Sequence, residues 1–596
     1  MKQWIACGWV LLISVFQPAP AVAGSSHERW WPVQAEPKAV IRTQSDPAPF
    51  ASRAALEMML QSVAGLAAKA VNEGHGDEMV WVNNGNVDLE DWYARLRAKR
   101  PALRQTGTLS PWDLVERFAK RGIIKGYILY RSDKSIGESN AYRPDMDCSV
   151  NVATSLAGLL DGIIVDEGLE KEAKAHGLKQ LLDVRGKTQT WCFETYEAQF
   201  SRRMLCTQDP RKPHVRDLAI AQKAFTVYGK DEPITTAMAW LEPLSPILGW
   251  NGGDEFATTM LSTSYGHIQT ATDWCMNLPV LMAGTESGSF PRVQSLDPAT
   301  IRWDDPRSAV SFIGTDGDNV QWFQGNFFRG DKSYWGNPDR GKVPYGWSTC
   351  FAQLAQLCPQ AIDYALVTRS TNDWFIEWGG GYYFPDHFGN KRTNRWELLA
   401  VQARRTWGLM KQANTRIIGF NFEDYNSPEA HQAYRIFASQ TDGLLAILVF
   451  QYSRYEAGAG ETFWVKDRNG VEVPVITARY SLWEHQNARE HSGTPTKVAR
   501  EIRQTVEKAR KVPRYDWIIA HAWSYFKHAP GSDENAEDME QENAAAKGGS
   551  RGYRPVTWCA ERLPSSIRVI SPEELMWRIR MNHNPSETKE FMRHLR

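Results

Sequence analysis

The sequence lacks the motifs that mark the commonest metal and redox sites. Its eight cysteines include no CxxC pair, and neither HExxH nor HxxxH occurs among its 13 histidines. These absences disfavour a zinc ribbon, a thioredoxin-type site and a zinc protease of the HExxH type. We therefore predict no metal-ligand set and no cofactor.

An excess of charge of either sign is also missing. The 596 residues include 69 lysines and arginines and 69 aspartates and glutamates. A neutral balance gives no electrostatic reason to bind nucleic acid or an acidic membrane surface. We expect a neutral partner and no nucleic acid.

Long apolar runs are confined to the start of the chain. Lys2 precedes an apolar run over residues 4–16, and Ala-Val-Ala at 21–23 precedes Gly24. This order is typical of a signal peptide, which we place at residues 1–23. The run is shorter than the roughly 20 residues that span a bilayer, and we expect no later segment of that length. The sequence thus predicts a secreted or periplasmic protein without membrane embedding.

Seven cysteines follow the predicted leader, and an exported protein can form disulfides. Two pairs lie close together in the sequence, Cys192 with Cys206 and Cys350 with Cys358. We expect these local disulfides. The odd number leaves one thiol that is unpaired or joined to another chain.

Residues 24–305 alternate between β-rich apolar runs and helical patterns. The runs "MVWVNNG", "GIIKGYILY", "DGIIVDE" and "LPVLMAG" are the expected strands. Such alternation is typical of α/β layers with parallel sheets. We predict three Rossmann-like α/β subdomains at residues 24–135, 136–228 and 229–305.

Residues 306–596 repeat the alternation more regularly, after a proline-containing linker at residues 297–309. The expected strands are "AVSFIGTDGDN", "DYALVTRS", "RIIGFNFEDYNS", "GLLAILVFQYS", "VPVITARYSLW" and "DWIIAHAWSY". Nearly continuous apolar strands indicate a sheet covered on both faces. We predict a TIM-like β/α barrel, complete or incomplete, with an open doubly wound sheet as the alternative. The polar segment 530–555 is a predicted lid.

Polar residues at strand ends are the first candidates for a site, because a β/α barrel places its active site at the carboxyl ends of its strands. In chain order these candidates are Asp316, Asp318, Asn319, Asp373, Glu423, Gln451, Arg479, His521 and Trp523.

Three of these groups have competing interpretations. In "TDGDN", Asp316 and Asp318 flank a glycine, and close acids raise the pKa of one of them, as a general acid requires. A turn or a cation-binding loop is the alternative. Glu423 is either a catalytic acid or a cap of the next helix. His521 and Trp523 share one strand face and could share a sugar site, but for His521 alone we favour a packed core histidine.

A glycine-rich stretch, "WGGGYYFP" at residues 378–385, carries a resemblance. Gly379, Gly381, Tyr382 and Pro385 match the signature of the GxGYxYP family of putative glycoside hydrolases, with Phe384 replacing its second tyrosine. "TDGDNVQW", "VPYGWS" and "TNDWF" also resemble that family, in the same order. The resemblance covers most of the chain and implies an exported protein that processes carbohydrate.

Our leading hypothesis is a glycoside hydrolase that acts on a carbohydrate substrate with two carboxylates about 5 to 9.5 Å apart. We assign Asp318 and Glu423 as the pair, oriented by Asp316 and Asn319. The expected sugar platforms are Trp347, Tyr382 and Trp523. A metal-dependent carbohydrate esterase or deacetylase and a non-catalytic glycan-binding protein are the alternatives.

One further acidic stretch lies in the N-terminal region. In "GWNGGDEF", residues 249–256, Asp254 and Glu255 follow a double glycine. These acids could complete a pocket between domains, where ligand sites often form. We favour the simpler interpretation, that they are exposed acids of a turn.

Overall fold

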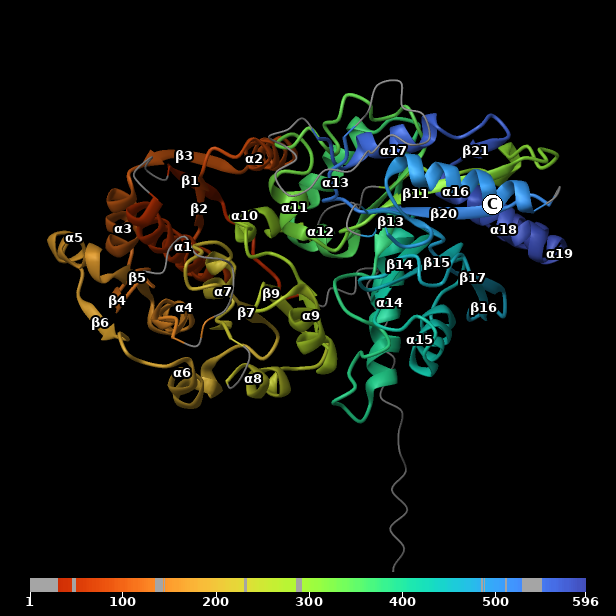
Figure 1. Ribbon diagram of the computed structural model, residues 1–596. Coiled ribbons are helices and arrows are strands. Elements are labelled where there is room, and N and C mark those ends of the chain that lie inside the picture. The colour runs from red at the N-terminus through yellow and green to blue at the C-terminus, as the bar shows by residue number, and fades with distance from the viewer. Residues whose placement is uncertain are drawn as a thin grey trace, which may run out of the picture.

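The computed structural model describes residues 31–44, 50–133, 143, 145–229, 233–285, 292–483, 486, 488–509, 512–527 and 549–595. The predicted signal peptide and most of the predicted lid lie outside these residues. The fold is mixed α/β with parallel sheets, as the sequence predicts. In Figure 1 the first three sheets lie on the left, in red to yellow, and the large sheet lies on the right.

Three small parallel sheets form the N-terminal half. The first has the order β2-β1-β3, with β1 Ala39–Gln44, β2 Glu78–Asn83 and β3 Arg104–Leu109. The second, β5-β4-β6, contains β4 Gly126–Tyr130, β5 Gly162–Asp166 and β6 Gln180–Asp183. The third, β10-β9-β7-β8, contains β7 Leu205–Thr207, β8 Phe225–Val227, β9 Pro246–Gly249 and β10 Ile268–Thr270. The helices of this half are α1 Phe50–Asn72, α2 Val87–Lys99, α3 Pro111–Lys120, α4 Ser149–Leu160, α5 Glu170–Ala175, α6 Gln189–Tyr196, α7 Arg216–Ala221, α8 Ile234–Trp240, α9 Glu255–Ser264 and α10 Leu278–Met282.

One large sheet forms the C-terminal half, in the order β16-β17-β15-β14-β13-β12-β11-β20-β18-β19, with β21 also paired to β11. Its pairs are parallel except β16 with β17. The strands are β11 Ser308–Gly314, β12 Tyr345–Thr349, β13 Asp373–Trp378, β14 Ile417–Phe422, β15 Ala446–Gln451, β16 Thr462–Lys466, β17 Glu472–Thr477, β18 Tyr480–Leu482, β19 Ser492–Gly493, β20 Tyr515–Ala520 and β21 Ile567–Val569.

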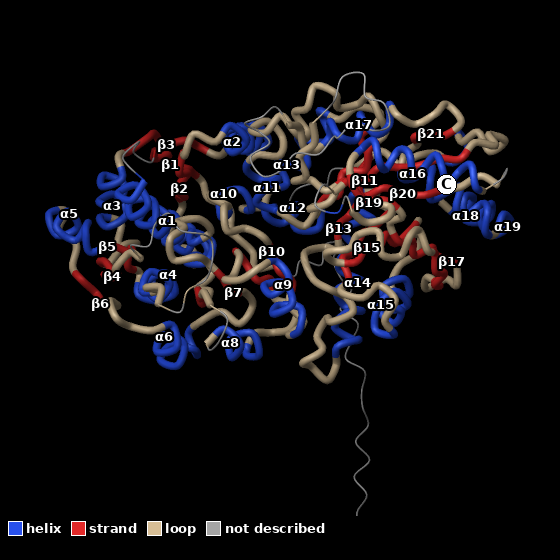
Figure 2. The backbone as a smooth tube through the Cα atoms, in the orientation of Figure 1, coloured by secondary structure: helices blue, strands red, loops and turns tan. Residues whose placement is uncertain are grey.

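Helices and loops surround this sheet, whose strands are red in Figure 2. The helices are α11 Val320–Gly325, α12 Phe351–Leu357, α13 Pro359–Thr368, α14 Arg395–Ala413, α15 Pro428–Ser439, α16 Pro495–Lys508, α17 Tyr553–Glu561, α18 Pro572–His583 and α19 Pro585–His594. The described strands form an open path that begins at β16 and ends at β19, so they do not close a TIM-like barrel.

Two expected strands are helices. "DYALVTRS" lies largely in α13, and "LPVLMAG" contains α10. Periodicity does not separate a short apolar strand from a buried helical segment. Each of these helices has a proline in its first turn, Pro359 in α13 and Pro279 in α10, where the missing N–H removes no intrahelical hydrogen bond.

Two of the predicted domain limits divide a sheet, and the third lies between sheets. The limits at residues 135 and 228 lie between strands of a single sheet, because β4 pairs with β5 and β7 pairs with both β8 and β9. The limit at residue 305 lies just before β11.

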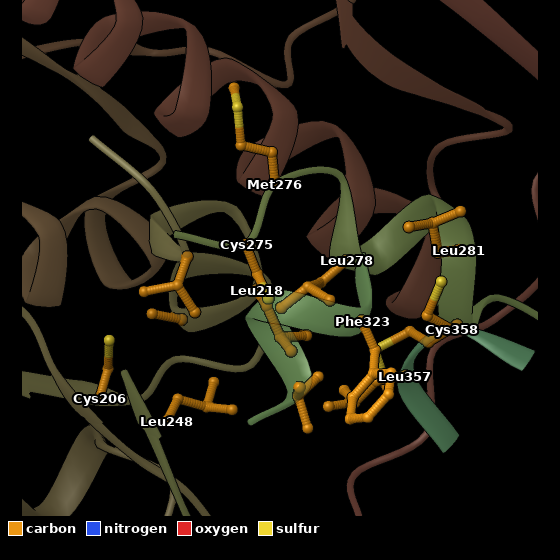
Figure 3. Close-up of a cluster of buried hydrophobic side chains, with 14 of the residues drawn as sticks. Cys206, Leu218, Leu248, Cys275, Met276, Leu278, Leu281, Phe323, Leu357 and Cys358 are labelled. Carbon is orange, nitrogen blue, oxygen red and sulfur yellow. The ribbon is translucent and has the colours of Figure 1, made fainter. Parts of the chain in front are cut away.

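A continuous apolar core joins the two halves of the molecule. Figure 3 shows Leu218 of α7 and Leu248 of β9 near Leu278, with Phe323 of α11 and Leu357 of α12 beside them. These side chains are buried and belong to one cluster. The third small sheet and the large sheet are therefore held in one packed unit.

The expectation that no later segment has membrane-spanning length is wrong for α1. Residues Ala54–Asn72 are long and apolar enough by length and composition, but 94% of the apolar window is buried inside the protein. The helix contacts α7, β2 and β5. It packs here as a core helix.

The two expected disulfides are not formed. Cys350 and Cys358 flank α12, and the rise of the intervening helix separates them by about 12 Å, beyond the reach of a disulfide. Cys192 lies in α6 and Cys206 in β7, and both are buried thiols. Burial raises the pKa of Cys192 and of Cys358 to about 12.

Polar contacts attach the first small domain to the C-terminal half. Trp92 Nε1 donates to the Gln324 carbonyl at 2.7 Å. The buried Asp88 carboxylate accepts from the Arg329 and Phe328 N–H groups at 3.0 and 3.3 Å. These bonds hold α2 against α11 and the turn that follows it.

Replacing Asp88 should therefore weaken the whole fold. We expect Asp88→Ala to lower the free energy of unfolding by about 2 to 3 kcal/mol, because it leaves buried N–H groups without an acceptor. Asp91→Ala is the control, since Asp91 of the same helix forms only a partly exposed ion pair with Arg329, and it should cost less than about 1 kcal/mol. Equal losses in urea denaturation would contradict the docking role of Asp88.

Candidate active site

A cavity of about 370 Å³ lies between the third small sheet and the large sheet. Its size is within the range of small-molecule sites. The wall is mostly polar and aromatic, and it comes from both halves: Asp209, Lys212, Tyr228, Trp250, Asn251, Gly253, Glu255, Ala271, Asp273, Trp274, Asp316, Asp318, Asn319, Gln321, Tyr382 and Trp523.

The "TDGDN" segment turns sharply after β11, at the centre of the large sheet. Asp316 has a φ of 64°, in the left-handed region that non-glycine residues seldom adopt. A side chain at Gly317 would place its Cβ 2.5 Å from the Ser348 carbonyl carbon of β12. Asn319 then caps α11. The tight turn places Asp316 and Asp318 in the cavity wall.

Hydrogen bonds fix the Asp316 carboxylate. The Thr315 hydroxyl donates to Oδ2, and Trp523 Nε1 donates to Oδ1 at 2.7 Å. Trp523 follows β20, which pairs with β11. Both oxygens of Asp316 are therefore oriented by neighbouring strand ends.

The "WGGGYYFP" loop connects the two halves. Gly379, Gly380 and Gly381 all have positive φ values, 69°, 74° and 133°, and turn the chain directly after β13. Tyr382 then pairs with Gln269 of β10 through two main-chain hydrogen bonds of 3.0 and 3.2 Å. Phe384, where the family signature has tyrosine, is buried against Phe256 and Tyr452.

The Tyr382 hydroxyl donates a hydrogen bond to Glu255 Oε1. Glu255 is the first residue of α9, and the preceding Asp254 caps this helix by accepting from the Ala257 N–H at 2.8 Å. Both acids are exposed, as expected, but Glu255 begins a helix instead of lying in a turn, and it lines the cavity. This glutamate reaches the cavity from the N-terminal half.

Crowding of the acids raises two of their pKa values. Asp318 is only 8% exposed, and burial, followed by the charges of Asp316 and Glu255, raises its pKa well above the usual value. The Glu255 side chain is accessible to solvent from the cavity, although the cavity walls place many protein atoms around its carboxyl group. Burial and the charge of Asp316 raise its pKa to about 7, although the Tyr382 hydrogen bond acts in the opposite direction.

Seven predicted site residues take part in this arrangement. Asp316, Asp318, Asn319, Tyr382 and Trp523 line the cavity. Gly379 and Gly381 contribute through the backbone turn that delivers Tyr382. The remaining six lie elsewhere.

Glu423 does not line the cavity with Asp318. Its carboxylate forms an ion pair with His387, its N–H donates to Asp386 Oδ2 at 3.1 Å, and its side chain is 46% exposed. β14, which precedes Glu423, lies three strands from β11, or about 14 Å across the sheet. This spacing exceeds the 9.5 Å limit for a carboxylate pair.

Asp373 and Trp347 form a structural contact. Asp373 begins β13, at the opposite end from the turn into the glycine loop. It accepts from Trp347 Nε1 at 2.8 Å and pairs with Arg340. Trp347 is buried among other rings, so it is not a sugar platform.

Three other candidates have contacts outside the cavity. Gln451 ends β15, four strands from β11. Arg479 pairs with Asp516 at 2.6 Å. His521 stacks on Trp483 with a centroid distance of 4.7 Å and bonds Ser524 at 2.8 Å, as expected for a packed histidine.

Sequence reasoning missed the loops of the third small sheet. Asp209 follows β7, Trp250 follows β9, and Asp273 and Trp274 follow β10. The signal was present, because each is a polar or aromatic residue just after a short parallel strand. Only Trp250, within "GWNGGDEF", belongs to a stretch that the sequence marks as a possible part of a pocket.

Among the described residues, no group of three or more His, Cys, Asp or Glu side chains is arranged to hold a metal ion.

Comparison with family models gives three matches. The "GxGYxYP putative glycoside hydrolase C-terminal domain" matches residues 307–528, the second N-terminal domain of that family matches 124–200, and the third matches 202–283. The chain belongs to the GxGYxYP family. A search of the curated proteins gives no match.

A solved structure shares the fold of this GxGYxYP protein. It is described as a putative hydrolase from Bacteroides thetaiotaomicron VPI-5482, with 20% sequence identity and a TM-score of 0.73. The alignment covers 94% of this chain and 98% of that chain. The whole arrangement of small and large sheets is thus found in a second protein.

The glycine loop gives a direct test of this geometry. An alanine Cβ at position 381 would lie 2.2 Å from Ile268 Cγ2 and 2.7 Å from Gln353 Nε2, at a φ that suits glycine. We expect Gly381→Ala to lower the free energy of unfolding by about 2 to 4 kcal/mol, measured by urea denaturation.

Gly408→Ala is the matched control. Gly408 lies inside α14, where an added Cβ meets no atom within 4 Å. Alanine should stabilise the helix there by about 0.5 to 1 kcal/mol. An unchanged stability of Gly381→Ala would show that the loop does not need glycine at this position.

Proposed function

We propose that the protein is a glycoside hydrolase whose reacting carboxyl groups are Glu255 and Asp316. The observation that carries the proposal is the meeting of Glu255, Asp316 and Asp318 in one cavity, with the signature tyrosine Tyr382 bonded to Glu255. Pairs of carboxyl groups whose environments give them different proton affinities are the usual arrangement for hydrolysis of a glycosidic bond.

Glu255 is assigned as the general acid. A pKa of about 7 leaves a large fraction of this carboxyl protonated near neutral pH, so it can give its proton to the glycosidic oxygen. Asp318 is assigned a supporting role, because it is the most buried of the three acids, and its burial and the two neighbouring acids raise its pKa, which disfavours a further negative charge in the cluster.

Asp316 is assigned as the carboxylate that faces the anomeric carbon. Its two hydrogen bonds hold it in one orientation. As the C–O bond breaks, the leaving group takes the Glu255 proton. Asp316 either takes a proton from the water that attacks the anomeric carbon, or itself bonds that carbon. In the second case a water that gives its proton to the Glu255 carboxylate then displaces Asp316 and releases the sugar.

The family description supports a glycoside hydrolase, and the solved relative is described as a hydrolase. The carbohydrate substrate, the carboxylate mechanism and export to a secreted or periplasmic location are parts of our proposal. The predicted signal peptide supports the location.

Isosteric substitution tests the assignments. On polysaccharides that the wild type cleaves, Glu255→Gln and Asp316→Asn should each lower kcat/KM by about 10² to 10⁴, because each removes a reacting group. Asp318→Asn should cost less than about tenfold, since Asp318 is not assigned as a reacting group and asparagine keeps its shape. The measurement is release of reducing ends from a panel of polysaccharides and aryl glycosides.

Glu423→Gln is the matched control and should stay within about twofold of wild type. A loss for Glu423→Gln as large as that for Asp316→Asn would restore the pair expected from sequence. If all four variants keep full activity, the reacting groups lie elsewhere. If the wild-type protein binds a glycan but does not cleave it, the result supports the alternative of a non-catalytic glycan-binding protein.

The pH profile gives an independent test. Glu255 must be protonated to act, so kcat/KM should fall as the pH rises through about 7. The Tyr382 hydrogen bond favours the charged form of Glu255, so Tyr382→Phe should raise the pKa and shift this alkaline limb to higher pH. A profile measured from pH 5 to 9 in which Tyr382→Phe moves the limb to lower pH would contradict the assignment.

A further inference from the structure

Trp274 is an exposed aromatic ring in the cavity wall. Its side chain is 53% exposed, and it is the one aromatic residue among the exposed large hydrophobic side chains of the described chain. It follows β10 in the third small sheet, whereas Asp316 and Asp318 follow β11. The ring therefore forms an outer part of the cavity, open to solvent.

Neighbouring groups hold this ring in place. The main-chain N–H of Trp274 donates to Gln321 Oε1 at 2.8 Å, which ties the residue to α11. Lys212 Nζ lies 4.4 Å from the centroid of the Trp274 ring, and the His214 ring lies 5.0 Å away. A side chain held before a ligand arrives loses little conformational entropy on binding.

The charges around Trp274 are largely paired within the protein. Lys212 forms an ion pair with Asp273 at 2.5 Å, and Arg211 forms one with Asp209 at 2.6 Å. With Asp209 and Asp273 paired in this way, the remaining negative charge of the cavity lies on the cluster of Glu255, Asp316 and Asp318. An anionic ligand would be repelled, whereas a neutral ligand with many hydroxyl groups meets hydrogen-bond partners at each pair.

We infer that Trp274, with Asp209, Lys212 and Asp273, forms a second sugar subsite for an uncharged oligosaccharide whose scissile bond lies at Glu255 and Asp316. This inference rests on the proposed function and extends it to the substrate class. The axial C–H bonds on one face of a sugar ring suit the electron-rich face of an indole. The hydroxyl groups at the edge of the sugar can form hydrogen bonds with the paired charged groups.

The subsite gives the N-terminal half a direct part in substrate choice. A substrate with a single sugar ring reaches the acids without covering Trp274. A longer chain covers both. Comparing substrates of different length therefore distinguishes the contribution of this subsite from that of the reacting groups.

The experiment compares Trp274→Ala with wild type on two substrates, an uncharged oligosaccharide that the wild type cleaves and an aryl glycoside of one sugar. For Trp274→Ala we expect a loss in kcat/KM of about tenfold or more on the oligosaccharide, mainly through KM, and less than twofold on the aryl glycoside. Trp112→Ala is the matched control, because the half-buried Trp112 ring of α3 also lies against a histidine ring, that of His176 at 4.9 Å, but outside the cavity.

Equal behaviour of Trp274→Ala and Trp112→Ala on the oligosaccharide would overturn the subsite and leave the proposed function intact. If the wild type cleaves no glycan, calorimetric binding of uncharged oligosaccharides still decides the question. Binding that is lost in Trp274→Ala supports the subsite without the hydrolase, and no binding to wild type overturns both. Polyuronate fragments that bind as tightly as uncharged ones would overturn the substrate class.

Discussion

Two main-chain hydrogen bonds between Tyr382 and Gln269 fix the relative position of the two halves of the cavity. They form because three consecutive glycines with positive φ turn the chain back toward β10 directly after β13. Through the Tyr382 hydroxyl the same contact reaches Glu255. The placement of one acid against the other two thus depends on this backbone contact and on the side-chain hydrogen bond that extends from it.

Gathering three carboxyl groups in one cavity opposes folding, since burial and mutual repulsion both disfavour their charged forms. The surrounding structure offsets this cost. The shared apolar core keeps α7, β9, α11 and α12 packed together, and α2 adds buried polar contacts at the far end of α11. A rigid frame of this kind is what allows a site to hold groups that would otherwise move apart.

The sequence predicted local structure better than it predicted which strands and segments lie side by side in the fold. Eight of the ten apolar runs contain strands, among them the run that ends in "TDGDN". Glu423 was chosen because it is a carboxylate at the end of an apolar strand, yet β20 lies beside β11 and β14 lies three strands away. Trp523 therefore reaches Asp316 and Glu423 does not. Glu255 depends on packing between distant segments, which periodicity and turn chemistry do not encode.

The division of the cavity between two sheets has a consequence for how such chains diversify. Residues 307–528 match one family model and residues 202–283 match another, yet the wall of the cavity takes side chains from both. Exchange of either segment between relatives would join two half-sites shaped for different ligands. Selection on substrate use therefore acts on the two segments jointly, and they are expected to be inherited as one unit.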